Sequence, residues 1–295
     1  MNKEINQLCQ KINYQDILNK KFYPVWFFTN ERINHFFSEI ENNREIEKVY
    51  SVGGGGDFAF SLLSTHASNI VELDICDIRQ MACVSIDFKI GLLKNLNFEE
   101  FVNLFLKRES FPKRRINKRI EETITPLSKK IIEPILENCN KDDFLKCLKK
   151  SGLWYWDSFW QIKNRKDYLP YLISKERYNC LQKNLDKITI YAGDFNENLQ
   201  RFQNNYYDLI YVSNILDSKK YCPETNLYLQ TIKDKLGSNG LLFAVAQSNP
   251  KKMIKFIEQN GFSLKQKQIH KFNIISSILG HYDYSFLLFR KNDLG

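Results

Sequence analysis

Four consecutive glycines followed by an acidic residue are the part of the sequence best suited to chemistry. Gly53 to Gly56 follow the short apolar run Val49 to Val52, and Asp74 closes a second apolar run. Glycines let a chain turn tightly after a strand and let a ligand lie against bare backbone at a helix N-terminus. An acid about 20 residues further on, at the end of the next strand, can accept hydrogen bonds from two ribose hydroxyls. The pattern predicts a nucleoside site, and the alternative is an ordinary turn with a solvated Asp.

The same stretch leaves the kind of nucleoside open. A dinucleotide fingerprint needs a third small residue where the helix crosses the strand. Counted from Gly53 and Gly55 that position is Phe58, and counted from Gly54 it is Ala59. The glycines alone do not separate a dinucleotide from another nucleoside.

Polar residues also follow the later predicted strands. Residues 188 to 195 are expected to be a strand ending in Gly-Asp, and the continuous apolar run from 207 to 217 is typical of a buried parallel strand. Ligands of open α/β sheets bind beyond the carboxyl ends of the strands. We therefore expect four polar residues at the edge that carries the glycines: Asp194, Ser213, Asn214 and Asp217.

The elements that would position these residues alternate between strand and helix. Apolar spacing predicts helices over 80 to 96, 223 to 236 and 250 to 259, and further strands at 241 to 246, 262 to 270 and 284 to 290. No obvious helix separates the last two strands, which predicts a hairpin-like ending. We expect one domain over 1 to 295, with an N-terminal helical and aromatic cap at 1 to 46 and a helical insertion at 90 to 186.

The composition narrows the class of protein. The chain has 295 residues, of which 43% are hydrophobic and 26% charged, and its seven cysteines form no CxxC pair. This composition suggests neither a disulfide framework nor a metal site. No apolar run is long enough to cross a membrane and no signal-peptide pattern is seen, so a cytoplasmic protein is expected.

The positive charge is concentrated in one segment. The formal net charge is +9, and Lys107 to Arg119 hold seven basic residues against one acid, Glu109. Such a segment could meet the phosphates of RNA or of an anionic membrane, which would place the protein at the inner membrane face. The alternative is a solvated helix face.

Four stretches together resemble the motifs of class I S-adenosylmethionine (SAM)-dependent transferases. They are Glu47 to Asp57, Glu72 to Asp74, Ala192 to Phe195 and Asp208 to Ser213. The resemblance implies an α/β, Rossmann-like methyltransferase fold, with a mostly parallel sheet and an antiparallel last strand. It also implies SAM as the donor substrate, without a metal.

A finer resemblance is to the SAM:diacylglycerol 3-amino-3-carboxypropyl transferases of betaine-lipid synthesis. It is carried by Tyr23 to Trp26, Asp74 to Gln80, Lys89, Leu96 to Phe101 and Ser213 to Leu216. It implies transfer of the aminocarboxypropyl group to a lipid or small-molecule acceptor, with release of methylthioadenosine. Two alternatives stay open: a SAM methyltransferase acting on RNA or a small molecule, and a non-catalytic module that binds a SAM-like nucleoside.

The resemblance also implies roles for single residues. The three glycines Gly53, Gly54 and Gly55 would admit the donor, Asp74 would hold the ribose with help from Gln80, and Asp194 with Phe195 would hold the adenine. Three further residues complete the expected site: Tyr23 and Trp26 at the aminocarboxypropyl arm or sulfonium, and Ser213 after the fourth strand. Asp217 is the candidate base, with Asp157 behind it.

Overall fold

The structure is a computed structural model of the whole chain. It describes residues 25–26, 46–66, 69–107, 126–137, 146, 154–155, 169–218, 223–247, 249–272 and 282–292.

The central feature is a seven-stranded sheet with the strand order β5-β3-β2-β6-β7-β9-β8. Strands β3, β2, β6 and β7 run parallel, and β9 runs antiparallel to both β7 and β8. The strands are β2 (Lys48–Val52), β3 (Glu72–Asp77), β5 (Ile188–Ala192), β6 (Tyr207–Tyr211), β7 (Leu236–Ala246), β8 (Phe262–Phe272) and β9 (Tyr282–Lys291). The mostly parallel sheet, its antiparallel last strand and the helices between the strands confirm the predicted α/β, Rossmann-like fold class.

Backbone contacts divide the chain into two compact units. The first unit contains Met1–Asn34, Gly53–Ala67 and Asp77–Gly193, and the second contains His35–Val52, Ser68–Cys76 and Asp194–Gly295. A single domain over the whole chain stays a prediction.

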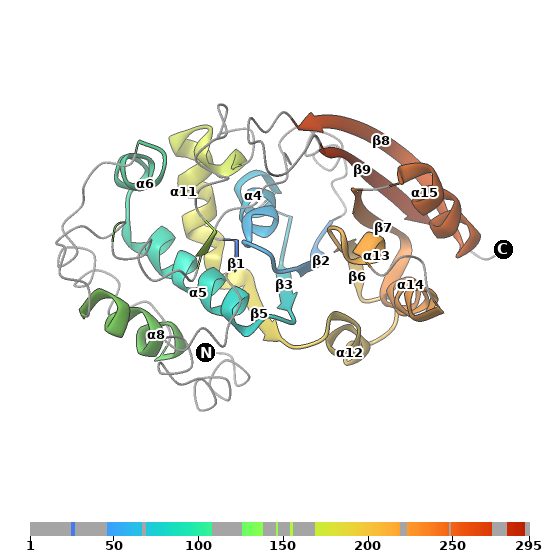
Figure 1. Cartoon of the computed structure of the whole chain (residues 1–295), viewed down its shortest axis with the longest axis horizontal. Helices are drawn as coiled ribbons and strands as arrows, with labels where there is room; N and C mark the ends of the chain where they lie inside the picture. Colours follow the sequence, from blue (N-terminus) through green and yellow to red (C-terminus); the bar gives the residue numbers. More distant parts are fainter. Residues whose placement is uncertain are drawn as a thin grey trace. The chain divides into compact units, whose positions relative to one another are not determined.

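The second unit contains most of the sheet. Its helices are α12 (Phe195–Gln200), α13 (Ile215–Ser218), α14 (Pro223–Lys235) and α15 (Pro250–Gln259). Strands β8 and β9 run side by side as two long strands, and α15 contacts β8 (Figure 1). The interior is apolar on both faces of the sheet, because side chains of β2, β6, β7 and β9 are fully buried: Tyr50, Leu209, Phe243 and Leu287. Such continuous burial is typical of central strands.

The described residues of the first unit are mainly helical. Its helices are α4 (Asp57–His66), α5 (Gln80–Asn95), α6 (Phe98–Phe105), α8 (Pro126–Glu137), η2 (Pro170–Leu172), α11 (Lys175–Asn184) and η3 (Leu185–Lys187). Two short strands, β1 (Val25–Trp26) and β4 (Trp154–Tyr155), pair in parallel. Of the helices, α5 is buried over most of its length and contacts α8 (Figure 1). It continues to Asn95, so the predicted insertion boundary at residue 90 falls inside a helix.

Helix α6 shows how the sequence fixes an element boundary in this unit. Asn97 accepts a hydrogen bond from the Glu100 N–H, and the Glu100 carboxylate accepts one from the Asn97 N–H. This capping box satisfies two backbone donors that a helix start otherwise leaves unpaired.

Among the helices that the structure describes, none combines the length and apolarity needed to span a bilayer.

Candidate functional site

The glycine turn joins β2 to α4. It closes with a 2.7 Å hydrogen bond from the Gly56 N–H to the Gly53 carbonyl. Gly54 and Gly56 have φ values of 49° and 78°, which lie in the left-handed region. A Cβ would cost roughly 1–2 kcal/mol in that conformation. Among the described residues, no atom beyond its chain neighbours lies within 4 Å of the position that a Gly54 Cβ would occupy, so bare backbone is open there, as a ligand-binding turn requires.

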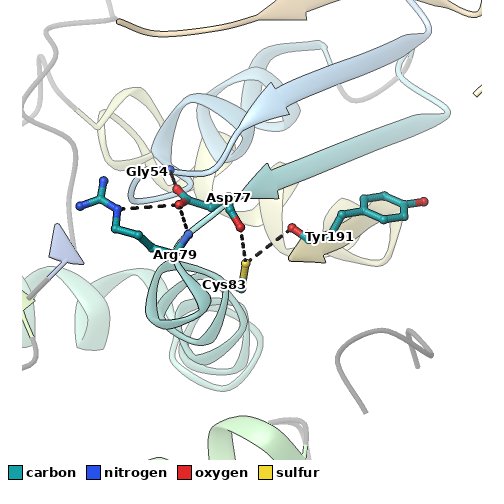
Figure 2. A network of polar contacts seen from close by, with 5 residues as sticks. All are labelled: Gly54, Asp77, Arg79, Cys83 and Tyr191. Atoms are coloured by element: carbon teal, nitrogen blue, oxygen red, sulfur yellow. Dashed lines mark hydrogen bonds and ion pairs between the residues drawn. The ribbon is translucent and has the colours of Figure 1, made fainter. Parts of the chain in front are cut away.

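The acid at this turn is Asp77, the last residue of β3. Its Oδ2 accepts the Gly54 N–H at 2.9 Å, and its Oδ1 accepts the Arg79 N–H at 2.9 Å (Figure 2). A Cβ on Gly53 would lie 2.8 Å from the Cβ of Asp77. Only glycine at position 53 therefore lets the turn rest on this carboxylate.

Burial and hydrogen bonding act against each other on Asp77. The side chain is only 6% exposed, and burial raises the pKa of its carboxyl group, while the Arg79 N–H, the Arg79 guanidinium and the Gly54 N–H lower the pKa. The guanidinium Nε stands 3.9 Å from Oδ1, on a side chain that is half exposed. Ile78, which lies between Asp77 and Arg79 in the chain, is 68% exposed.

The thiol of Cys83 contacts the end of β3, where Asp77 lies. Cys83, in the first turns of α5, lies 3.6 Å from the Asp77 carbonyl and 3.6 Å from the Tyr191 carbonyl of β5, and its S–H is the donor (Figure 2). The Gly193 N–H also donates to the Asp77 carbonyl at 3.0 Å. The backbone of Asp77 is thereby held on the side away from the turn.

The predicted position of Asp74 is wrong. Asp74 lies in the middle of β3 and is fully buried, and its Oδ2 accepts the Tyr207 hydroxyl at 2.7 Å. The strand continues because Ile75 and Cys76 are buried and pair with Ser51 and Val52 of β2. Asp77 occupies the strand end at which Asp74 was expected. The ribose role of Asp74 stays a prediction.

Asp194 and Phe195, which are neighbours in the chain, lie in the second unit. Asp194 caps α12, because its Oδ1 accepts the N–H groups of Asn196 at 2.8 Å and Glu197 at 3.1 Å. Its Oδ2 accepts the Tyr228 hydroxyl at 2.6 Å. Burial, followed by this hydrogen bond, raises the pKa of Tyr228. Contact with adenine stays a prediction for both residues.

Residues after β6 differ in part from the prediction. The strand ends at Tyr211 rather than running to 217, and residues 215–218 form α13. Ser213 has φ 46°, an uncommon value for a residue with a side chain, and its carbonyl accepts the Val245 N–H at 2.7 Å. Asp217 accepts the Gln247 N–H at 2.9 Å, which ties α13 to the end of β7. Its role as a base stays a prediction.

Other predicted residues are placed in part or not at all. Gln80 is the first residue of α5 and is half-buried. Tyr23, Asp157 and residues 108–119 lie outside the described residues, and Trp26 is described only through the backbone of β1. Lys107 is exposed. In the part of the chain that the structure describes, no group of three His, Cys, Asp or Glu side chains could hold a metal ion.

Comparisons with known proteins find similarity only at the level of three-dimensional structure. No family profile and no curated protein matches the chain. A precorrin-6y C5,15-methyltransferase from Geobacter metallireducens is 7% identical, covers 92% of this chain and 94% of its own, and gives a TM-score of 0.44. A SAM-dependent methyltransferase from Methanosarcina mazei is 8% identical, with coverages of 86% and 97% and a TM-score of 0.42. The N-methyltransferase NodS from Bradyrhizobium japonicum is 10% identical, with coverages of 89% and 100% and a TM-score of 0.37.

Proposed function

We propose that the protein is a SAM-dependent transferase, with methyl transfer as the first candidate reaction. The observation that carries the proposal is the contact between the glycine turn and Asp77, where Oδ2 accepts the Gly54 N–H at 2.9 Å. This contact joins a bare backbone turn to an acid at the ends of neighbouring strands. Ligands of open α/β sheets bind at such strand ends.

Asp77 has the acceptor capacity that a ribose needs. A carboxylate offers about four lone-pair sites. One site of Asp77 is used by the Gly54 N–H and one by the Arg79 N–H, which leaves capacity for two hydroxyl donors. The exposed side chain of Ile78 would cover one face of the base, and the open space beside Gly54 would take the methionine part of the donor.

We put methyl transfer before aminocarboxypropyl transfer because the solved structures to which the chain is similar bear the names of methyltransferases. SAM supplies electrophilic carbons on one sulfonium, and the protein selects among them by placing the acceptor in line with one C–S bond. The roles of Tyr23 and Trp26 at the aminocarboxypropyl arm stay predictions.

The acceptor is proposed only as a class. The acceptor of methyl transfer would be RNA or a small molecule, and the acceptor of aminocarboxypropyl transfer would be a lipid or a small molecule. The basic segment Lys107 to Arg119 would provide phosphate contact in either case.

The test is to incubate the purified protein with SAM labelled with carbon-13 in its methyl group, together with an extract containing lipids and RNA. S-adenosylhomocysteine and a labelled acceptor, above a control lacking the protein, are the expected products. Release of methylthioadenosine, together with an acceptor that gains an unlabelled aminocarboxypropyl group, would show that the protein catalyses aminocarboxypropyl transfer and not methyl transfer. Binding of SAM without either product across extracts would favour a non-catalytic nucleoside-binding module, and failure to bind SAM would refute the proposal.

A further inference from the structure

A buried charged cluster lies against the glycine turn in the first unit. The Lys89 side chain of α5 and the Asp57 side chain of α4 are both 0% exposed, and Lys89 Nζ stands 3.0 Å from Asp57 Oδ1. The buried Tyr171 hydroxyl donates to the same Oδ1 at 2.8 Å. Lys89 Nζ also lies 5.6 Å from the ring centroid of Phe60, within the range of a cation–π contact.

The cluster reaches the turn through one backbone atom. Lys89 Nζ donates to the Gly55 carbonyl at 2.6 Å. Gly55 lies between the two glycines with positive φ. Its carbonyl belongs to the peptide unit that joins Gly55 to Gly56, so the hydrogen bond from Lys89 acts directly on that unit of the turn.

Burying a lysine in this way needs a reason beyond stability. Burial lowers the pKa of Lys89, and the neighbouring Asp57 opposes that shift. Buried ion pairs can often be replaced by apolar side chains without loss of stability, because desolvation offsets much of the attraction. An ammonium group that donates to the carbonyl of a ligand-binding turn instead fixes the direction in which that carbonyl points.

We propose that Lys89 is a positioning residue that holds the Gly55 carbonyl, with Asp57 and Tyr171 fixing its ammonium group, so that the turn keeps the shape that receives the donor. The proposal rests on the donor site proposed above. Lys89 itself, being fully buried, does not touch the donor.

The test separates turn geometry from overall stability. In Lys89→Met, both the hydrogen bond to Gly55 and the cation that pairs with Asp57 are lost, so we expect a lower Tm and a Kd for S-adenosylhomocysteine raised at least tenfold. In the double variant Lys89→Met with Asp57→Asn, the uncompensated buried charge is removed. We expect its Tm to recover while its Kd stays high, because the Gly55 carbonyl is still unheld.

A milder variant covers the case in which Lys89→Met does not fold. Tyr171→Phe keeps the ring and removes only the hydrogen bond to Asp57, and we expect a Kd raised about threefold with little change in Tm. The matched control is Ser128→Ala. Ser128 is a buried residue of α8, and its hydroxyl contacts Asp87 of α5, the helix that also carries Lys89. It should lower Tm and leave the Kd unchanged.

Two results would overturn the proposal: an unchanged Kd in Lys89→Met, or a Kd that recovers together with Tm in the double variant.

If the wild-type protein binds neither SAM nor S-adenosylhomocysteine, the proposed donor site fails by itself. Amide hydrogen exchange then still decides the positioning role. The Gly56 N–H is hydrogen-bonded within the turn. Its exchange should accelerate at least tenfold in the double variant and not in Ser128→Ala, and equal exchange in all three proteins would refute the role.

Discussion

At the scale of single residues, two buried acids on one strand have different partners. Asp74 is fully buried and bonded to Tyr207, whereas Asp77 touches the glycine turn. We expect Asp77→Asn to raise the Kd for S-adenosylhomocysteine by roughly 10- to 100-fold, because a hydrogen bond to a charged group contributes about 1.5–3 kcal/mol. Asp74→Asn should instead lower the free energy of unfolding by about 1–3 kcal/mol and leave the Kd unchanged. Calorimetric titration measures the Kd, and urea unfolding measures the free energy of unfolding. A Kd that rises in Asp74→Asn but not in Asp77→Asn would assign the ribose role to Asp74.

The turn offers a second pair of variants. The Cβ of an alanine at position 54 meets no atom within 4 Å in the part of the chain that the structure describes, whereas that of an alanine at position 53 meets Asp77. Gly54→Ala should cost roughly 1–2 kcal/mol of stability from its left-handed conformation and should block donor binding, because the methyl group fills the open space. Thermal unfolding gives the first quantity and titration of S-adenosylhomocysteine the second. Donor binding at wild-type strength in Gly54→Ala would show that the ligand does not use this space.

The pKa shift of Asp77 predicts a pH dependence of donor binding. Because burial raises the pKa of this carboxyl group above its usual 3.8, the group becomes protonated at a higher pH than an exposed Asp and gives up an acceptor. Affinity for S-adenosylhomocysteine should be constant at neutral pH and fall as the pH drops through the raised pKa. Stability has the opposite sign: the shift favours the folded state below 3.8, and this contribution is lost as pH rises through the folded pKa. Asp77→Asn should lack both effects, and an identical acid limb in that variant would assign the titration elsewhere.

At the scale of elements, Asp194 acts first as a helix cap. Its carboxylate accepts two N–H groups of α12 and the Tyr228 hydroxyl. We expect Asp194→Ala to lower the free energy of unfolding by about 1–2 kcal/mol, from loss of the cap. Asn97→Ala removes the cap of α6 and should cost about 1 kcal/mol. If adenine also contacts Asp194, only the first variant will weaken the binding of S-adenosylhomocysteine; equal affinities would limit Asp194 to capping.

Most element boundaries could be predicted because local signals agree with burial. Helix α15 has the predicted bounds Pro250–Gln259, with Asn249 as its cap and Pro250 at its start. Strand β6 was predicted too long, because Val212 and Leu216 are as apolar as the strand but lie beyond it. Apolar composition alone does not distinguish a strand from the buried turn that follows it.

At the scale of the whole molecule, the antiparallel hairpin closes the sheet. Strand β9 contributes buried side chains on both faces, and Leu287 is fully buried. We expect Leu287→Ala to lower the free energy of unfolding by about 2–5 kcal/mol, because it leaves a cavity in the core. Ile269→Ala, on neighbouring β8, removes a side chain that is 56% exposed and should change stability by less than about 0.5 kcal/mol. Urea unfolding compares the two, and similar losses would mean that the hairpin is not part of the core.

The sequence alone determined the strand and helix alternation, the glycine turn and the hairpin-like ending, because apolar spacing, glycines and capping residues act over short distances. Together with the family resemblance, these signals led to the fold class. They also located the acid to within one strand.

Only the tertiary structure decided which acid meets the turn and what holds the turn in place. Asp74 and Asp77 both follow apolar residues, and the difference comes from pairing with β2, which carries β3 on to Asp77. Lys89 reaches the turn from a helix 34 positions along the chain, and Tyr171 contacts Asp57 across 114 positions. Such contacts depend on how the elements pack in space. Local patterns in the sequence do not reveal that packing.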